Sequence, residues 1–339
     1  MTTTRAYQRW HEIDLIKAAS IVTVVLIHSI NSGFGYQGRV EKILGAWSLF
    51  AVPSFLFAAG FLFPKSGPST GTLARKLAHR ILPPYLICSV IMLGMRATWL
   101  EPRLGSPSAF QWFAMFAFGQ TGPIYYFVFV IGYLYALSLW WRKWPTRWVF
   151  VLWCFELVLI FVFYARLSWF FPKQSNLFWF ILFRHPIVHL LPYLTGWLVS
   201  IHYAQIRPWL LRHAKGLIAG ALLTDIVLVG LIQIVQKSPI DKWLSQVHIY
   251  TCLLALICIG ICYPIKSRAV RLLSETSYAI YLIHFPIVRA LQYLWTDSWH
   301  KHVTCGILVT WCMGTVCTVL LIATLKKLLG LRSKLIIGA

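Results

Sequence analysis

Two ionisable residues share one apolar stretch near the N-terminus, Lys17 and His28 in the segment IKAASIVTVVLIHS at residues 16–29. An imidazole can accept a proton from a reacting group, and an ammonium group can bind an anion. On an α-helix eleven residues turn through about 1,100°, so the two side chains lie on one face, roughly 16 Å apart along the axis. Asp14 precedes Lys17 by one turn and is its expected ion-pair partner. We therefore predict one polar face with a charged pair at one end and a candidate base at the other.

Both residues also have a simpler interpretation. Lys17 can be an interfacial lysine whose ammonium group reaches the lipid headgroups, and His28 can be a histidine hydrogen-bonded inside a helical bundle. An ionisable group inside a membrane span costs at least a few kcal/mol, so it requires either a partner or a function. The sequence alone leaves both interpretations open.

A second cluster of chemically capable residues is the segment RKLAHRILPPYL at residues 75–86. Its basic side chains, Arg75, Lys76 and Arg80, come just before an apolar run that contains Tyr85. A basic loop at this position is an ordinary topology signal. It is also a candidate anion site, because guanidinium groups match the geometry of phosphates.

A third cluster is the segment SETSYAIYLIHFP at residues 274–286. Ser274 is the expected N-cap of the helix that follows. The polar residues of that helix recur at helical spacing and share one face, which must point into the bundle rather than toward lipid. They are Ser277, Tyr278, Tyr281 and His284. We expect them to form either a hydrogen-bonded seam or the lining of a polar site.

The elements that position these clusters are membrane helices. The 339 residues are 59% hydrophobic and only 12% charged, whereas soluble domains are about 25% charged. Apolar runs of roughly 20 residues, the length that crosses a bilayer, recur along the whole chain. We predict ten transmembrane helices, at residues 13–30, 43–63, 81–100, 111–140, 148–165, 177–201, 214–236, 247–264, 276–295 and 303–325. The expected fold is an all-α polytopic membrane protein with a single domain over residues 1–339.

The net charge of +22 is explained by topology. With ten spans and a cytoplasmic N-terminus, most of the basic residues fall in segments on the cytoplasmic side, which follows the positive-inside rule. Both termini are therefore expected in the cytoplasm, with membrane lipids as partners and no nucleic acid. The eight cysteines lie in or beside apolar runs and are interpreted as core residues. His185 and His189 have metal-ligand spacing but no evident third ligand, so no metal is expected.

In this order, the clusters resemble the acyltransferase 3 family of integral membrane O-acyltransferases. That family has a basic residue, ten residues and then histidine in its first span, as Lys17 and His28 do here. Further similar segments are VPSFLFAAGFLF (52–63), RKLAHRILPPYL (75–86), GPIYYFVFVIGYLYAL (122–137), LPYLTGWLV (191–199) and LSETSYAIYLIHFPI (273–287). The resemblance covers nearly the whole chain.

The resemblance implies a multi-pass enzyme of the plasma membrane, which is the inner membrane in bacteria. It would move an acyl group, usually acetyl from acetyl-CoA or another acyl-CoA, to a hydroxyl of a sugar, polysaccharide or glycolipid at the outer face. Lys17, Arg75, Lys76 and Arg80 would then bind the donor. His28 would act as the general base or as a covalent acyl carrier, with Asp14, Tyr85 and the stripe of residues 277–284 in support.

Secondary transport is the competing interpretation. Buried Asp, Glu and His residues can form an intramembrane proton relay, and this chain has Glu156 and Asp225 in predicted spans. Transporters of this kind more often contain internal repeats and paired broken helices. The sequence contains no evident repeat, which favours the acyltransferase.

Overall fold

The computed structural model describes residues 9–30, 38–63, 69–95, 112–113, 115–116, 118–160, 185, 187–235, 239–299 and 302–339. These residues form helices and turns and contain no strand. The helices are α1 (His11–Ser29), α2 (Arg39–Trp47), η2 (Ser48–Phe50), α3 (Ala51–Phe61), α4 (Thr70–Lys76), η3 (Leu77–Ile81), α5 (Leu82–Met95), α7 (Tyr126–Trp141), α8 (Thr146–Val158), α11 (Ile187–Ile234), α12 (Pro239–Cys262), α13 (Arg268–Glu275), α14 (Ser277–Trp299), α15 (Val303–Leu329), η7 (Gly330–Arg332) and α16 (Ser333–Ile336). The predicted all-α fold is confirmed.

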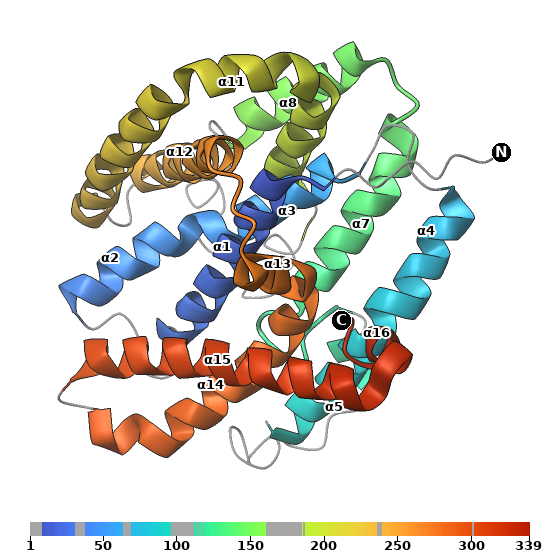
Figure 1. Cartoon of the computed structure of the whole chain (residues 1–339), viewed down its shortest axis with the longest axis vertical. Helices are drawn as coiled ribbons and strands as arrows, with labels where there is room; N and C mark the ends of the chain where they lie inside the picture. The colour runs from blue at the N-terminus through green and yellow to red at the C-terminus, as the bar shows by residue number, and fades with distance from the viewer. Residues whose placement is uncertain are drawn as a thin grey trace.

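Helix α1 lies at the centre of the bundle (Figure 1). Its apolar residues are buried almost all round, as expected for a helix enclosed by others rather than by lipid. The indole N–H of Trp311 on α15 donates to the Val22 carbonyl at 2.8 Å. The side-chain amide of Gln292 on α14 donates to the Ser29 carbonyl at 2.9 Å. These bonds fix α1 against the two helices that end the chain.

Glycine allows α3 and α11 to cross backbone against backbone. A Cβ atom on Gly60 would lie 2.0 Å from the carbonyl oxygen of Tyr193, and one on Gly196 would lie 2.0 Å from that of Phe57. No side chain fits at either position, so the two helices approach more closely than any other residue type permits. Gly260 on α12 has the same relationship with the backbone of Glu12, since a Cβ there would lie 2.5 Å from the Glu12 Cα.

The predicted sixth and seventh spans are joined in one helix. We expected a loop between residues 201 and 214, but α11 runs through it for 48 residues. Such a helix is about 72 Å long, more than twice the hydrocarbon thickness of ~30 Å. It contains Pro192 and Pro208 and is arched over one side of the bundle (Figure 1). Proline removes one helix hydrogen bond and bends the helix without ending it, so the connection between these two spans is helical.

Five helices of the described part are long and apolar enough to cross a membrane. They are Arg39–Phe61, Thr70–Met95, Ile187–Ile234, Ile240–Cys262 and Val303–Ile336. Large apolar side chains on these helices are exposed, such as Ile226 at 72% and Val90 at 60%. An apolar surface this extensive is typical of contact with lipid. The helices therefore indicate an integral membrane protein, and the total of ten spans stays a prediction.

The two ends of the described chain lie at the same end of the bundle. Arg9 donates to Glu275, the last residue of α13. A Cβ on Gly338 would lie 2.6 Å from the Tyr278 ring, in the first turn of α14. Both ends of the described chain thus lie beside residues 275–278.

Candidate functional site

His28 lies against the middle of α14. Its imidazole ring is 5.3 Å from that of His284, centroid to centroid, with a tilt of 44°. It also meets the Phe285 ring edge-on at 5.3 Å. His28 is half-buried on the last turn of α1, and His284 is fully buried. Two helices from opposite ends of the chain therefore bring two imidazoles together.

The hydrogen bonds of His284 define its tautomer. Its Nδ1 lies 2.9 Å from the Ile280 carbonyl, one turn earlier on α14. A carbonyl can only accept, so Nδ1 carries the proton and a neutral ring leaves Nε2 as an acceptor. Nε2 is buried and has no hydrogen-bond partner within the described residues. Buried polar atoms are rarely left unsatisfied, so this nitrogen points to an interaction with a substrate or a water molecule.

Tyr281 adds a second buried polar group to this region. Its ring lies 6.3 Å from that of His284 and 5.4 Å from that of Phe127 on α7. Its hydroxyl is buried and likewise has no hydrogen-bond partner in the described part of the chain. The expected stripe on α14 thus faces the bundle interior, and two of its four members present unsatisfied polar atoms there.

Three other tyrosines hold parts of the bundle together through their hydroxyl groups. Tyr85 donates to the Phe116 carbonyl at 2.6 Å, Tyr125 to the Leu282 carbonyl at 3.0 Å and Tyr278 to the Ile81 carbonyl at 2.7 Å. Tyr85 and Tyr278 were expected to support the site. Their hydroxyl protons are used in these bonds, so we expect their support to consist of holding α5 to residue 116 and α14 to η3.

Asp14 forms an ionic network at the other end of α1. Arg9 donates to Asp14 at 2.5 Å and to Glu275 at 2.7 Å. The hydroxyl of Ser274 donates to Asp14 at 2.5 Å, and Arg271 donates to Glu275 at 2.9 Å. The hydrogen bond from Arg9 holds the pKa of Glu275 below its ordinary value. The network ties the start of α1 to α13, about four turns of α1 away from the histidine pair.

The network corrects one sequence prediction. Ser274 is not an N-cap, because it lies in the last turn of α13 and uses its hydroxyl on Asp14. Ser277, the next member of the stripe, donates to the Ser274 carbonyl at 2.9 Å. Lys17, on the same helix as Asp14, is half-buried. The structure therefore places Asp14, Lys17 and Ser277 toward one end of the bundle.

The basic cluster lies on a helix rather than in a loop. Arg75 is in α4, Arg80 is in the π-helical segment η3, and both side chains are exposed. The side chain of Lys76 lies outside the described part of the structure. Helices α4, η3 and α5 follow one another without interruption, and prolines 83 and 84 come directly after the π-helical turn. The bond from Tyr278 to Ile81 holds this turn against α14.

The sequence model of the acyltransferase 3 family, described as an acyltransferase domain, matches residues 10–326. The chain belongs to the acyltransferase 3 family. No curated protein and no solved structure matches it significantly. Family membership and the long apolar helices together identify a membrane acyltransferase.

In this acyltransferase the predicted site residues form two groups. His28, Tyr281 and His284 meet in the bundle interior, whereas Asp14, Ser277 and Tyr278 lie toward the end where the described chain begins and ends. A groove of about 690 Å³ between α8 and α11 contains none of them. Its exposed lining is mostly apolar, but Arg147, His202 and Gln205 are also among its residues.

Sequence reasoning missed one buried polar cluster of the acyltransferase. Asp225 on α11 has no partner evident from sequence, but in the structure it contacts His248, Thr251 and Cys252 of α12. The detectable signal is the spacing of His248 and Cys252, one turn apart on one helical face opposite an intramembrane acid. His185 and His189, the pair with metal-ligand spacing, do not belong to this cluster. Nδ1 of His185 accepts the N–H of Ile187 at the start of α11.

Proposed function

We propose that this membrane acyltransferase transfers an acyl group, most simply acetyl, from acyl-CoA to a hydroxyl group. The acceptor is a sugar, polysaccharide or glycolipid at the outer face of the plasma membrane, and both chain termini are cytoplasmic. The family supports acyl transfer in general. The donor, the acceptor and the sidedness are the proposal.

The observation that carries the proposal is the pairing of His28 with His284. Acyl transfer to a hydroxyl needs a group that removes the hydroxyl proton or a nucleophile that takes the acyl group first. His28 is a half-buried imidazole, and beside it lies a second imidazole whose Nε2 is an unsatisfied acceptor. Two imidazoles at this distance can relay a proton from one ring to the other, which a lone histidine cannot do.

Two routes are consistent with this arrangement. In the direct route His28 accepts the proton of the acceptor hydroxyl, and the hydroxyl oxygen attacks the thioester carbonyl at the same time. The carbon–sulfur bond breaks, and the CoA thiolate leaves and takes up the proton. In the carrier route a nitrogen of His28 attacks the thioester, CoA leaves as its thiol, and the hydroxyl then attacks the acyl-imidazole and regenerates His28. In both routes Nε2 of His284 can accept a proton.

The donor would enter from the end that holds the ionic network. CoA is rich in phosphate, and guanidinium groups bind phosphate strongly. Arg75 and Arg80 are exposed on the helix held to α14 by Tyr278, and Lys17 lies on α1. From Lys17 to His28 along α1 is roughly 16 Å. A thin thioester arm of about that reach would join a phosphate site at the cytoplasmic end to the histidine pair.

Labelled acetyl-CoA tests the proposal directly. Membranes containing the wild type or His28→Ala would be incubated with radiolabelled acetyl-CoA, and glycan and lipid fractions would be analysed for label. We expect acylated product with wild type and none with His28→Ala at equal protein level. His213→Ala is the matched control, because His213 is exposed and contacts only its own helix among the described residues, through the Trp209 carbonyl and ring.

Three outcomes would contradict parts of the proposal. Retained acylation in His28→Ala would remove His28 from the mechanism. Acylation from another acyl donor but not from acyl-CoA would remove the proposed donor. Substrate flux across the membrane without acyl transfer would favour the secondary transporter.

A further inference from the structure

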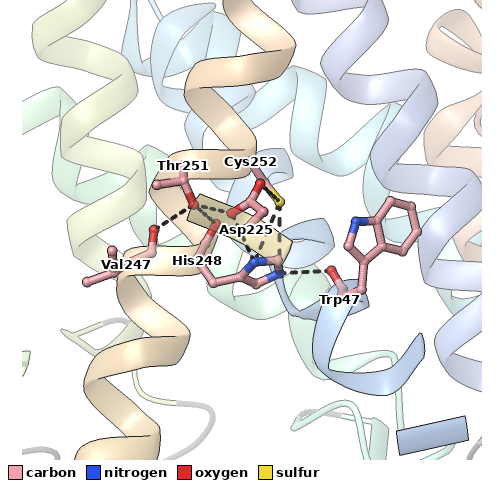
Figure 2. A network of polar contacts seen from close by, with 6 residues as sticks. All are labelled: Trp47, Asp225, Val247, His248, Thr251 and Cys252. Carbon is pink, nitrogen blue, oxygen red and sulfur yellow. Dashed lines mark hydrogen bonds and ion pairs between the residues drawn. The ribbon is translucent and has the colours of Figure 1, made fainter. Parts of the chain in front are cut away.

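A buried polar cluster joins α11, α12 and the end of α2 (Figure 2). Nδ1 of His248 lies 3.2 Å from Oδ1 of Asp225, and Sγ of Cys252 lies 3.0 Å from Oδ2 of Asp225. Sγ of Cys252 is also 3.8 Å from Nδ1 of His248. All three residues are buried, and one ligand atom of each lies within 4.8 Å of the others. None of them belongs to the proposed acyl-transfer site.

Trp47 determines how the His248 ring is used. Nε2 of His248 lies 3.0 Å from the Trp47 carbonyl, which can only accept, so Nε2 carries a proton. In a neutral ring Nδ1 is then a lone-pair donor, and it faces the Asp225 carboxylate, whereas Sγ of Cys252 lies 3.8 Å from both ring nitrogens (Figure 2). A second ring N–H bound to a backbone carbonyl is the usual support of a metal-binding histidine, because it fixes the tautomer and the ring orientation.

The three distances match one face of a metal coordination sphere. For a tetrahedral zinc ion with ordinary bond lengths, neighbouring N, O and S ligands lie about 3.4–3.6 Å apart. The 3.2 Å from Nδ1 to Oδ1 and the 3.8 Å from Nδ1 to Sγ differ from these by a few tenths of an ångström, and the 3.0 Å from Sγ to Oδ2 is shorter by about half an ångström. Side-chain movements within one rotamer cover such differences.

We propose that Asp225, His248 and Cys252 bind a divalent cation of intermediate softness, with Zn²⁺ as the best match. One thiolate, one imidazole and one carboxylate form a ligand set that zinc accepts, whereas Mg²⁺ and Ca²⁺ require oxygen ligands. Binding displaces the thiol proton, which leaves to solvent. The complex of Zn²⁺ with one carboxylate and one thiolate has no net charge, which suits a site inside the membrane.

The ion would fasten α11 to α12 and, through the Trp47 carbonyl, to α2. Three protein ligands leave a fourth position for a water molecule or for the hydroxyl of Thr251, which bonds to Asp225. A hydrogen-bonded network without a metal is the competing explanation. In it the Cys252 thiol and the Thr251 hydroxyl donate to Asp225 and His248 carries a second proton. The two explanations differ in metal content.

Metal analysis of the purified full-length chain tests the proposal. The protein would be purified in detergent without chelator, equilibrated with Zn²⁺, desalted and measured by elemental mass spectrometry. We expect about one zinc per chain for the wild type and for Cys258→Ser, a control that removes another buried thiol of α12. In Cys252→Ser and His248→Asn the affinity should fall by about tenfold or more, since losing even an outer-shell group costs that much.

Cobalt substitution gives a second readout that needs no variant. Co²⁺ loaded into the wild type should produce a thiolate-to-cobalt charge-transfer band and the visible bands of a tetrahedral ion, and excess Zn²⁺ should remove both. A wild type that retains no zinc and gives no thiolate band would overturn the proposal in favour of the hydrogen-bonded network. Equal zinc retention by wild type and Cys252→Ser would overturn it as well.

Discussion

The imidazole rings of His28 on α1 and His284 on α14 lie 5.3 Å apart. The Nδ1–H of His284 is held by the Ile280 carbonyl, so its Nε2 is the nitrogen left for chemistry. If His28 only filled space, there would be no reason for the buried Nε2 of His284 beside it to lack a hydrogen-bond partner among the described residues. The pair therefore behaves as one unit in the proposed reaction, and each ring has a distinguishable part in it.

The role of His284 is tested by His284→Asn. An asparagine amide can still donate toward Ile280 but lacks the acceptor nitrogen of the ring. We expect the protein to insert normally and acyl transfer to fall by about a hundredfold or more, the range of general acid–base effects. The measurement is initial rate with labelled acetyl-CoA at equal protein level. Wild-type turnover in this variant would limit His284 to packing.

The two chemical routes predict different single-turnover behaviour. If His28 carries the acyl group, mixing enzyme with labelled acyl-CoA and no acceptor should release up to one CoA per enzyme and leave label on the protein. His28→Ala should show neither signal. If His28 is a general base, CoA release should require the acceptor, and no labelled protein should form. A thiol-reactive dye follows CoA release, and rapid quenching follows the label.

Arg75 and Arg80 are predicted to act on donor binding. Replacing either with glutamine should raise KM for acyl-CoA by about tenfold, equal to ~1.4 kcal/mol, with little change in kcat. Arg147→Gln, on α8, is the matched control because it lines the separate groove. A lower kcat at unchanged KM would contradict the assignment of these residues to the phosphate site.

The glycine crossing between α3 and α11 is predicted to tolerate no side chain. Gly196→Ala places a methyl group 2.0 Å from the Phe57 carbonyl oxygen, so the helices must separate. We expect a loss of about 1–3 kcal/mol, as for other overpacked interiors, seen as a lower melting temperature in detergent. Gly220→Ala, in the same helix with open space around it, should be neutral or slightly stabilising. Equal melting temperatures for both variants would show that the crossing relaxes.

The ionic network should make stability depend on pH below neutrality. Arg9 lowers the pKa of Glu275, so the folded state binds fewer protons there than the unfolded state. The contribution is fully present above the ordinary Glu pKa of about 4.3 and is lost as pH falls through the lowered value. Because Glu275 is exposed, its size is about 0.2–1 kcal/mol and decreases with salt. The melting temperatures of the wild type and Glu275→Gln, measured as a function of pH, should converge at low pH. A difference that stays constant with pH would show that Glu275 does not cause the pH dependence.

The stripe on α14 is predictable from sequence because it is periodic. Residues that recur at helical spacing lie on one face of the helix, and this can be recognised without knowing which helix packs against it. Tyr281 and His284 are buried as this pattern requires. The all-α fold follows in the same way from the apolar runs. Local, repeating features of this kind need only one segment of chain to be recognised.

Pairings across the bundle are not predictable in this way. Nothing near residue 28 indicates that His284 lies beside it, and nothing near Asp225 indicates His248. Asp14 was expected to pair with Lys17 in its own helix, and it binds Arg9 and Ser274, which lie outside that helix. The continuity of α11 is not predictable from sequence either. Proline usually breaks a helix, but Pro208 lies inside α11, where packing against neighbouring helices keeps the helix continuous. Such contacts depend on helix order in space, which a single sequence does not encode locally.

The junction of α1 with α13 and α14 has a consequence for biosynthesis. Asp14 and Ser274 are 260 residues apart, so α1 enters the membrane long before its partners are translated. Until α14 emerges, His28 has neither His284 nor Phe285 beside it. An incomplete chain therefore lacks the histidine pair and, under the proposed mechanism, would not hydrolyse acyl-CoA. The proposal thus implies that the enzyme becomes active only when its last helices are in place.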